Sequence, residues 1–168
     1  MTSEQDNALA IYLEDHLAGS VQAVELIDNI REDHRHEELG KFATQLIEEV
    51  KADQETLRGI ADRVGTGASR LKDSTAWVAE KLTLIKLHRK SNSGLGDVET
   101  LEFLELGIQG KWALWRALGE IASSNGGLAG IDFRELEKRA STQNEKVEEQ
   151  RLRLVRKTFV ESSVSDTA

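Results

Sequence analysis

Apolar residues recur every three or four positions along most of this chain, and no proline interrupts the pattern. That spacing places apolar side chains on one face of an α-helix. Proline would remove a backbone donor and clash with the preceding helical turn, so its absence permits long helices. The alternating pattern typical of strands is missing. The pattern therefore predicts an all-α protein.

The first two helices are predicted from two apolar stripes with a short polar run between them. They span about residues 7–32 and 36–64, and Asp33 is suited to cap the second. Gly65 can adopt the left-handed conformation that ends a helix. The first stripe consists of Leu9, Leu13, Leu17, Val21, Val24 and Ile27. A short connection between two helices of this length favours an antiparallel hairpin.

The second half of the chain repeats this arrangement. A third helix is expected over about residues 98–123, with Asp97 as its N-cap, and residues 124–127 end it. Asp132 is expected to cap a fourth helix that runs to about Val160. The third stripe consists of Leu101, Leu104, Ile108, Trp112, Trp115 and Leu118.

Residues 66–96 connect the two predicted hairpins. Their apolar spacing predicts a fifth, shorter helix within this crossover, followed by a loop over residues 91–96. We interpret residues 1–168 as a single helical-bundle domain, with frayed ends at residues 1–6 and 161–168.

Two hairpins joined by one long crossover resemble the ferritin-like superfamily in helix and connection lengths. The resemblance covers nearly the whole chain and rests on architecture. It implies a ferritin-like four-helix bundle. Di-iron members of that superfamily place one Glu on each of two helices and a Glu-x-x-His on each of the other two.

The resemblance directs attention to carboxylates near the apolar stripes. Glu14 and Glu49 are separated by 35 residues, which is similar to the Glu-to-Glu spacing of the family. Ala52 occupies the position where the histidine should follow, and Asp53 is the nearest substitute. His16 could turn inward beside Glu14. Because the chain contains no Glu-x-x-His, a conventional di-iron centre is not expected.

Two interpretations of these carboxylates remain open. A weaker iron, manganese or zinc site could use Glu14, His16, Glu49 and Asp53. The simpler interpretation is that Asp53 or Glu49 pairs with a cation on a neighbouring helix, such as Lys111 or Arg139, because a buried charge is costly unless it is paired. We favour the pairing, and no cofactor is then required.

The third helix carries two interior glycines and two tryptophans, Gly107, Gly110, Trp112 and Trp115. Interior glycines destabilise a helix by roughly 1 kcal/mol each, so they are usually kept where another group comes close. These residues could line a pocket for an apolar ligand. The alternative is close helix packing, with the tryptophans filling the core and their N–H groups bonded to Gln109, Asp53 or Glu49.

Composition narrows the choice of function. With 30 acidic and 22 basic residues the formal net charge is −8, which disfavours nucleic acid. The chain contains no cysteine, so disulfides and thiolate metal sites are excluded. No window is apolar enough to span a membrane, and the acidic N-terminus does not resemble a secretory signal, so we expect a cytoplasmic location.

No catalytic motif stands out in the sequence. We therefore interpret the chain as a non-enzymatic helical bundle with a role in binding or assembly. The wide apolar stripe of the crossover, which includes Trp77, favours a homodimer or another homo-oligomer. The alternatives are a divergent ferritin-like metal-binding protein and a carrier of a small apolar ligand.

Overall fold

The computed structural model describes residues 3–65 and 93–160, which form four long helices and two short 3-10 helices. The long helices are α1 (Ser3–Asp33), α2 (Glu38–Val64), α4 (Ser93–Ile121) and α5 (Phe133–Phe159), and the short ones are η1 (Ala122–Ser124) and η2 (Gly126–Leu128). No strand occurs within these ranges, so the all-α prediction is confirmed. The predicted fifth helix and the frayed C-terminal segment lie outside the described residues.

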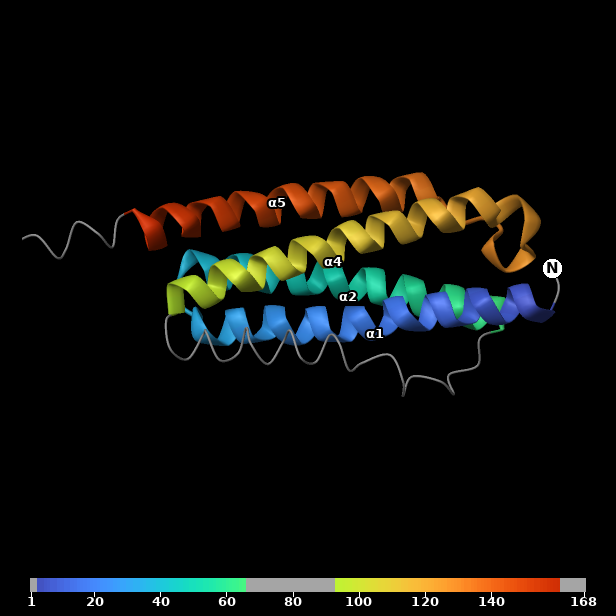
Figure 1. Ribbon diagram of the computed structural model, residues 1–168, viewed down its shortest axis with the longest axis horizontal. Coiled ribbons are helices and arrows are strands. Elements are labelled where there is room, and N and C mark those ends of the chain that lie inside the picture. Colours follow the sequence, from blue (N-terminus) through green and yellow to red (C-terminus); the bar gives the residue numbers. More distant parts are fainter. Residues whose placement is uncertain (1–2, 66–92, 161–168) are drawn as a thin grey trace, which may run out of the picture.

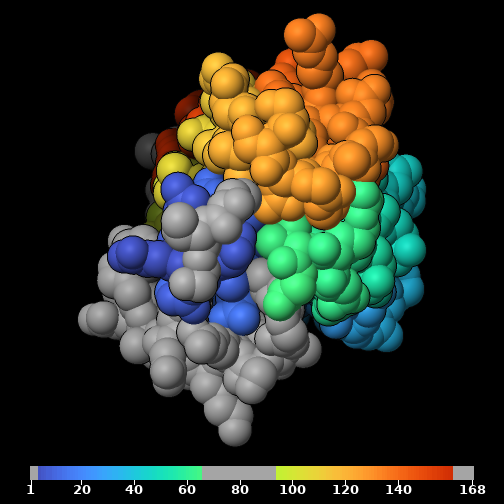
Figure 2. Space-filling view, turned by 90° about the vertical axis from the view of Figure 1, so that its right-hand side faces the viewer, coloured from blue at the N-terminus to red at the C-terminus, as the bar shows by residue number. Residues whose placement is uncertain are grey.

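The long helices form two antiparallel pairs that pack on each other (Figure 1). One pair is α1 with α2, and the other is α4 with α5. Contacts between the pairs join α1 to α4 and α2 to α5, while α2 and α4 run in the same direction. Figure 2 views the bundle from its end, with the α4–α5 pair above the α1–α2 pair. The start of α1 and the end of α5 therefore lie at opposite ends of the bundle.

The core lies between the two pairs and is built mainly from Leu, Ile and Val. Val21, which the sequence pattern assigned to the apolar stripe, is 46% exposed, and α1 instead buries Leu26 and Ile30. The reason is geometric: each step of four residues turns roughly 40° past one full helical turn. After three such steps from Leu9 the stripe has left the core-facing side. None of the described helices is long and apolar enough to cross a membrane.

The turn between α1 and α2 differs from the prediction. Asp33 is the last residue of α1 rather than the N-cap of α2, so that prediction is wrong. Glu37 occupies the N-cap position of α2 without a side-chain capping bond. The His34 carbonyl accepts from Glu37 N–H, which closes a tight turn that the polar pattern could not locate to the residue.

The start of α4 also differs from the prediction. The helix begins at Ser93, so Asp97 lies inside it and does not cap it. Asp97 is buried, and its Oδ2 lies 2.7 Å from His34 Nε2. This bond fixes the α1–α2 turn against the first turns of α4. Residues 93–96, expected to form a loop, are therefore helical.

Other boundaries agree with the sequence pattern. Asp132 Oδ1 accepts from Glu135 N–H and caps α5 as predicted. Gly65 has φ 84° and ends α2 in the left-handed conformation, also as predicted. α1 begins at Ser3, four residues before the predicted start, and α4 ends at Ile121, two residues before the predicted end.

Candidate functional site

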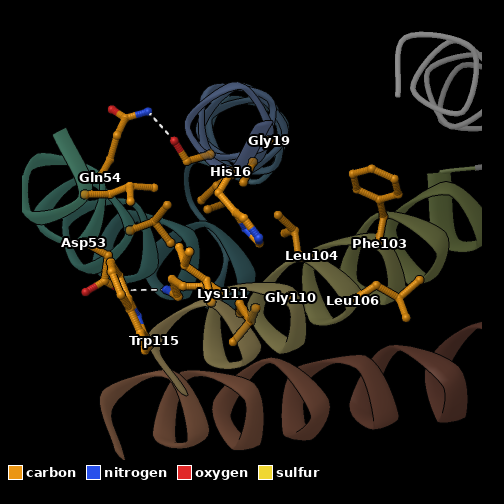
Figure 3. Close-up of a pocket in the computed structure, with 18 of the residues that line it drawn as sticks. His16, Gly19, Asp53, Gln54, Phe103, Leu104, Leu106, Gly110, Lys111 and Trp115 are labelled. Carbon is orange, nitrogen blue, oxygen red and sulfur yellow. Dashed lines mark hydrogen bonds and ion pairs between the residues drawn. The ribbon is translucent and has the colours of Figure 1, made fainter. Parts of the chain in front are cut away.

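A cavity of about 480 Å³ lies between α1, α2 and α4 (Figure 3). Most of its wall consists of aliphatic side chains, glycines and the rings of Phe103 and Trp115. Its rim includes exposed residues of α1 and α4, namely Asp15, Gly19, Leu106 and Gly107. A cavity of this kind has the size and lining of a small-molecule site.

Asp53 is the centre of a polar network that joins three helices. Its carboxylate is only 3% exposed and accepts from Lys111 Nζ at 2.6 Å and from Gln143 Nε2 at 3.0 Å. Arg139 also donates to Asp53, and Lys111 also donates to the side-chain amide oxygen Oε1 of Gln143. Burial lowers the pKa of Lys111, and the Asp53 carboxylate partly opposes that shift. The simpler interpretation, that Asp53 pairs with Lys111 and Arg139, is confirmed.

A second polar contact joins α1 to α2 in the cavity wall. Gln54 Nε2 donates to Ser20 Oγ at 2.9 Å, and Ser20 Oγ donates to the Leu17 carbonyl at 2.6 Å. Gln54 is buried, so this contact satisfies a polar side chain that would otherwise cost stability.

His16 lies where α1 approaches α4. Its ring packs edge-on against Tyr12, with 4.8 Å between ring centroids. A Cβ atom added to Gly110 would lie 4.0 Å from His16 Cε1, so the glycine leaves space beside the imidazole. Burial lowers the pKa of His16, which favours the neutral ring. The adjacent Asp15 carboxylate acts in the opposite direction.

The four residues predicted to form a pocket separate into two groups. Gly107, Gly110 and Trp115 line the cavity. Trp112 does not line it and is 37% exposed, with the Arg116 guanidinium 4.6 Å from its ring centroid. On a helix, positions 112 and 115 are about 60° apart around the axis, so Trp112 lies at the edge of the buried face of α4 and Trp115 lies within it.

The Trp115 indole N–H is buried without a hydrogen-bond partner in the described part of the chain. The sequence had indicated Gln109, Asp53 or Glu49 as acceptors, and none of them fills that role. Both oxygens of Asp53 are already engaged by other donors.

The four candidate metal ligands do not come together. His16 and Asp53 line the cavity, whereas Glu49 bonds to Lys146 at 2.7 Å beside α5. Glu14 is half-buried on α1 and does not line the cavity. Among residues 3–65 and 93–160, no three His, Asp or Glu side chains are grouped so that they could hold a metal ion.

Sequence reasoning did not identify Gln54 and Gln143 as parts of this site. Each is a buried polar residue on an apolar stripe. The signal for Gln143 was its place between Ala140 and Val147, three residues after one buried position and four before the other. A glutamine in such a position requires a buried partner.

Comparison of the chain with protein-family models, curated proteins and solved structures found no match.

Proposed function

We propose that this protein is a non-enzymatic helical bundle that binds a small, largely apolar ligand in the cavity between α1, α2 and α4. The observation that carries the proposal is the cavity itself. Its volume of about 480 Å³ falls within the range of small-molecule sites, and apolar side chains dominate its wall. Close packing normally leaves few voids of this size in a helical core.

The polar groups of the wall support binding rather than catalysis. A nucleophile needs an adjacent base to activate it, but Ser20 donates to a backbone carbonyl and accepts from a glutamine amide. Asp53 accepts from three side chains, so its oxygens are occupied. These groups stabilise the fold and shape the cavity.

The ferritin-like arrangement is part of this proposal. Two antiparallel pairs in which the second and third long helices run in parallel are consistent with one long crossover (Figure 1). Homo-oligomerisation stays a prediction. The metal-binding alternative is not favoured, because Asp53 and Glu49 are already paired with cations.

Binding can be tested with N-phenylnaphthylamine, a neutral apolar fluorophore whose emission rises when it leaves water. We expect saturable enhancement by the wild-type protein. Gly110→Leu should abolish most of this signal, because the new side chain would extend into the cavity beside His16. The emission titration measures the number of sites and the dissociation constant.

Gly59→Leu is the matched control. Gly59 is an exposed glycine inside α2, does not line the cavity, and has open space around its Cβ position. This variant should bind the fluorophore as the wild type does, and circular dichroism should show that both variants remain helical. Equal binding by Gly110→Leu and Gly59→Leu, or no saturable binding by the wild type, would contradict the proposal.

A further inference from the structure

The three helices that line the cavity change from apolar to polar in the same direction. On α4 the lining begins with Phe103, Leu104 and Leu106 and reaches Lys111 and Trp115 later. On α2, which runs parallel to α4, Leu46 and Val50 precede Asp53 and Gln54, and Leu57 follows them. One half of the cavity is therefore wholly apolar on these two helices, and the other half carries their polar groups.

The third helix agrees with this polarity. α1 runs in the opposite direction, and its lining residues begin with Asp15, His16 and Ser20 and end with Ala23 and Ile27. Figure 3 shows the result, with Phe103 and Leu106 at one end of the cavity and Asp53, Lys111 and Trp115 toward the other.

The cavity is also elongated. From Phe103 to Trp115 the lining advances 12 positions along α4, which corresponds to roughly 18 Å along the helix axis. A volume of about 480 Å³ spread over that length suits a narrow, extended molecule better than a compact one.

Among the described residues that line the cavity, Lys111 is the only lysine or arginine, and it lies in the polar half. The single carboxylate of Asp53 is shared between Lys111 and Arg139. Glu49 is balanced by Lys146. An ammonium group has three donors, and Lys111 uses two of them on Asp53 and Gln143. Asp15 is exposed at the rim, where solvent screens its charge.

We infer that the ligand is a single-chain amphiphile with a carboxylate head, whose tail lies along Phe103, Leu46 and Ile27 and whose head accepts a hydrogen bond from Lys111. This inference rests on the proposed function. An anionic head would accept a charge-assisted hydrogen bond from the third donor of the Lys111 ammonium. It would also bring an acceptor into the half of the cavity where the Trp115 N–H has none among the described residues. Burial lowers the pKa of Lys111, and a bound carboxylate would oppose that shift.

Isothermal titration calorimetry with three ligands of equal chain length tests the head group. Laurate, dodecanol and dodecyltrimethylammonium are each titrated into the full-length protein below their micellar concentrations. Laurate should bind roughly tenfold more tightly than dodecanol, as expected for one hydrogen bond to a charged group. The ammonium ligand should bind most weakly. Equal affinities for laurate and dodecanol would overturn the inference.

A pair of lysine variants locates the head. Lys111→Met should reduce the affinity for laurate roughly tenfold and leave the affinity for dodecanol unchanged. Arg139 and Gln143 still hold Asp53 in this variant. Lys146→Met also removes a lysine from an ion pair, but Lys146 does not line the cavity, so it should affect neither ligand. Equal losses in the two variants would contradict the placement.

Failure of this inference and failure of the proposed function give different results. If N-phenylnaphthylamine binds but laurate has no advantage over dodecanol, only the carboxylate assignment is wrong. If neither the fluorophore nor any of the three amphiphiles binds, the cavity is not a ligand site. Should Lys111→Met fail to fold, the ligand series on the wild-type protein decides the matter alone.

Discussion

Asp53 is a buried carboxylate held by side chains from two other helices. Lys111 comes from α4, while Arg139 and Gln143 come from α5. Desolvating these charges costs free energy that their mutual attraction must offset. The network therefore fixes the register of α2 against the α4–α5 pair more than it adds to net stability.

Removing the charge of Asp53 should destabilise the protein strongly. Asp53→Asn leaves Lys111 and Arg139 without the carboxylate that they share. We expect the free energy of unfolding to fall by about 3 kcal/mol. Glu49→Gln removes the same charge from a half-exposed pair and should cost less than about 1 kcal/mol. Urea unfolding of both variants measures the difference, and equal losses would show that the Asp53 network is not special.

Part of this network was predictable from the sequence. An aspartate on the apolar stripe of α2 requires a cation, and Lys111 and Arg139 were within reach on the predicted neighbours. The identity of the partners of Gln143 and the missing acceptor of Trp115 were not predictable. Both depend on side-chain geometry across three helices, which periodicity along one helix does not contain.

At the scale of the elements, glycines in helices have two opposite roles. Gly40 lies in the first turn of α2, where an added Cβ would lie 2.0 Å from the His34 carbonyl oxygen. Gly59 lies in the same helix with open space around its Cβ position. Only Gly40 is required by close packing, because the turn before α2 lies against it.

The same substitution should therefore have opposite effects at these two positions. Gly40→Ala forces the turn away from the helix and should destabilise the protein by about 2 kcal/mol. Gly59→Ala should stabilise it by about 0.5 to 1 kcal/mol, because alanine favours the helix. Thermal unfolding followed by circular dichroism tests both, and a stabilising Gly40→Ala would refute the close contact.

Helix boundaries were predictable where a local bond decides them. Asp132 caps α5 through its own side chain, and Gly65 ends α2 through its own backbone conformation. The prediction for Asp33 was wrong because α1 continues through it, and the prediction for Asp97 was wrong for a tertiary reason. Asp97 is buried against His34, which lies 63 residues away in the sequence. The residues around Asp97 carry no signal of that contact.

At the scale of the whole molecule, four long helices in two antiparallel pairs followed from apolar stripes and short connections. The cavity did not follow, although Gly107, Gly110 and Trp115 had been singled out as pocket residues. An unfilled space depends on how three helices fit together, and the same glycines would also suit a solid core.

The stability of the whole molecule should respond to acid through His16. Burial lowers the pKa of His16 in the folded state, so the unfolded chain binds the proton more readily. The histidine then favours folding above about pH 6.5 and loses that contribution as the pH falls below it. His16→Gln should show a smaller drop in melting temperature between about pH 7.5 and about pH 5.5 than the wild type.

His36→Gln serves as the control for that comparison, because His36 is exposed in the turn after α1. The carboxylates that titrate in this pH range change the melting temperature of both variants equally, so their effect cancels in the comparison. If acidification lowers the melting temperature of His16→Gln, His36→Gln and the wild type by the same amount, burial of the His16 imidazole does not contribute to the acid dependence of stability.

The direction of the helices has a consequence for engineering the chain. α1 begins at one end of the bundle and α5 finishes at the other (Figure 1). A helix of 27 residues such as α5 is roughly 40 Å long. In a circular permutant, the segment between the end of α5 and the start of α1, residues 160–168 and 1–2 included, would need at least about 12 extended residues. Conversely, two proteins fused to the start of α1 and the end of α5 would be kept at opposite ends of the bundle.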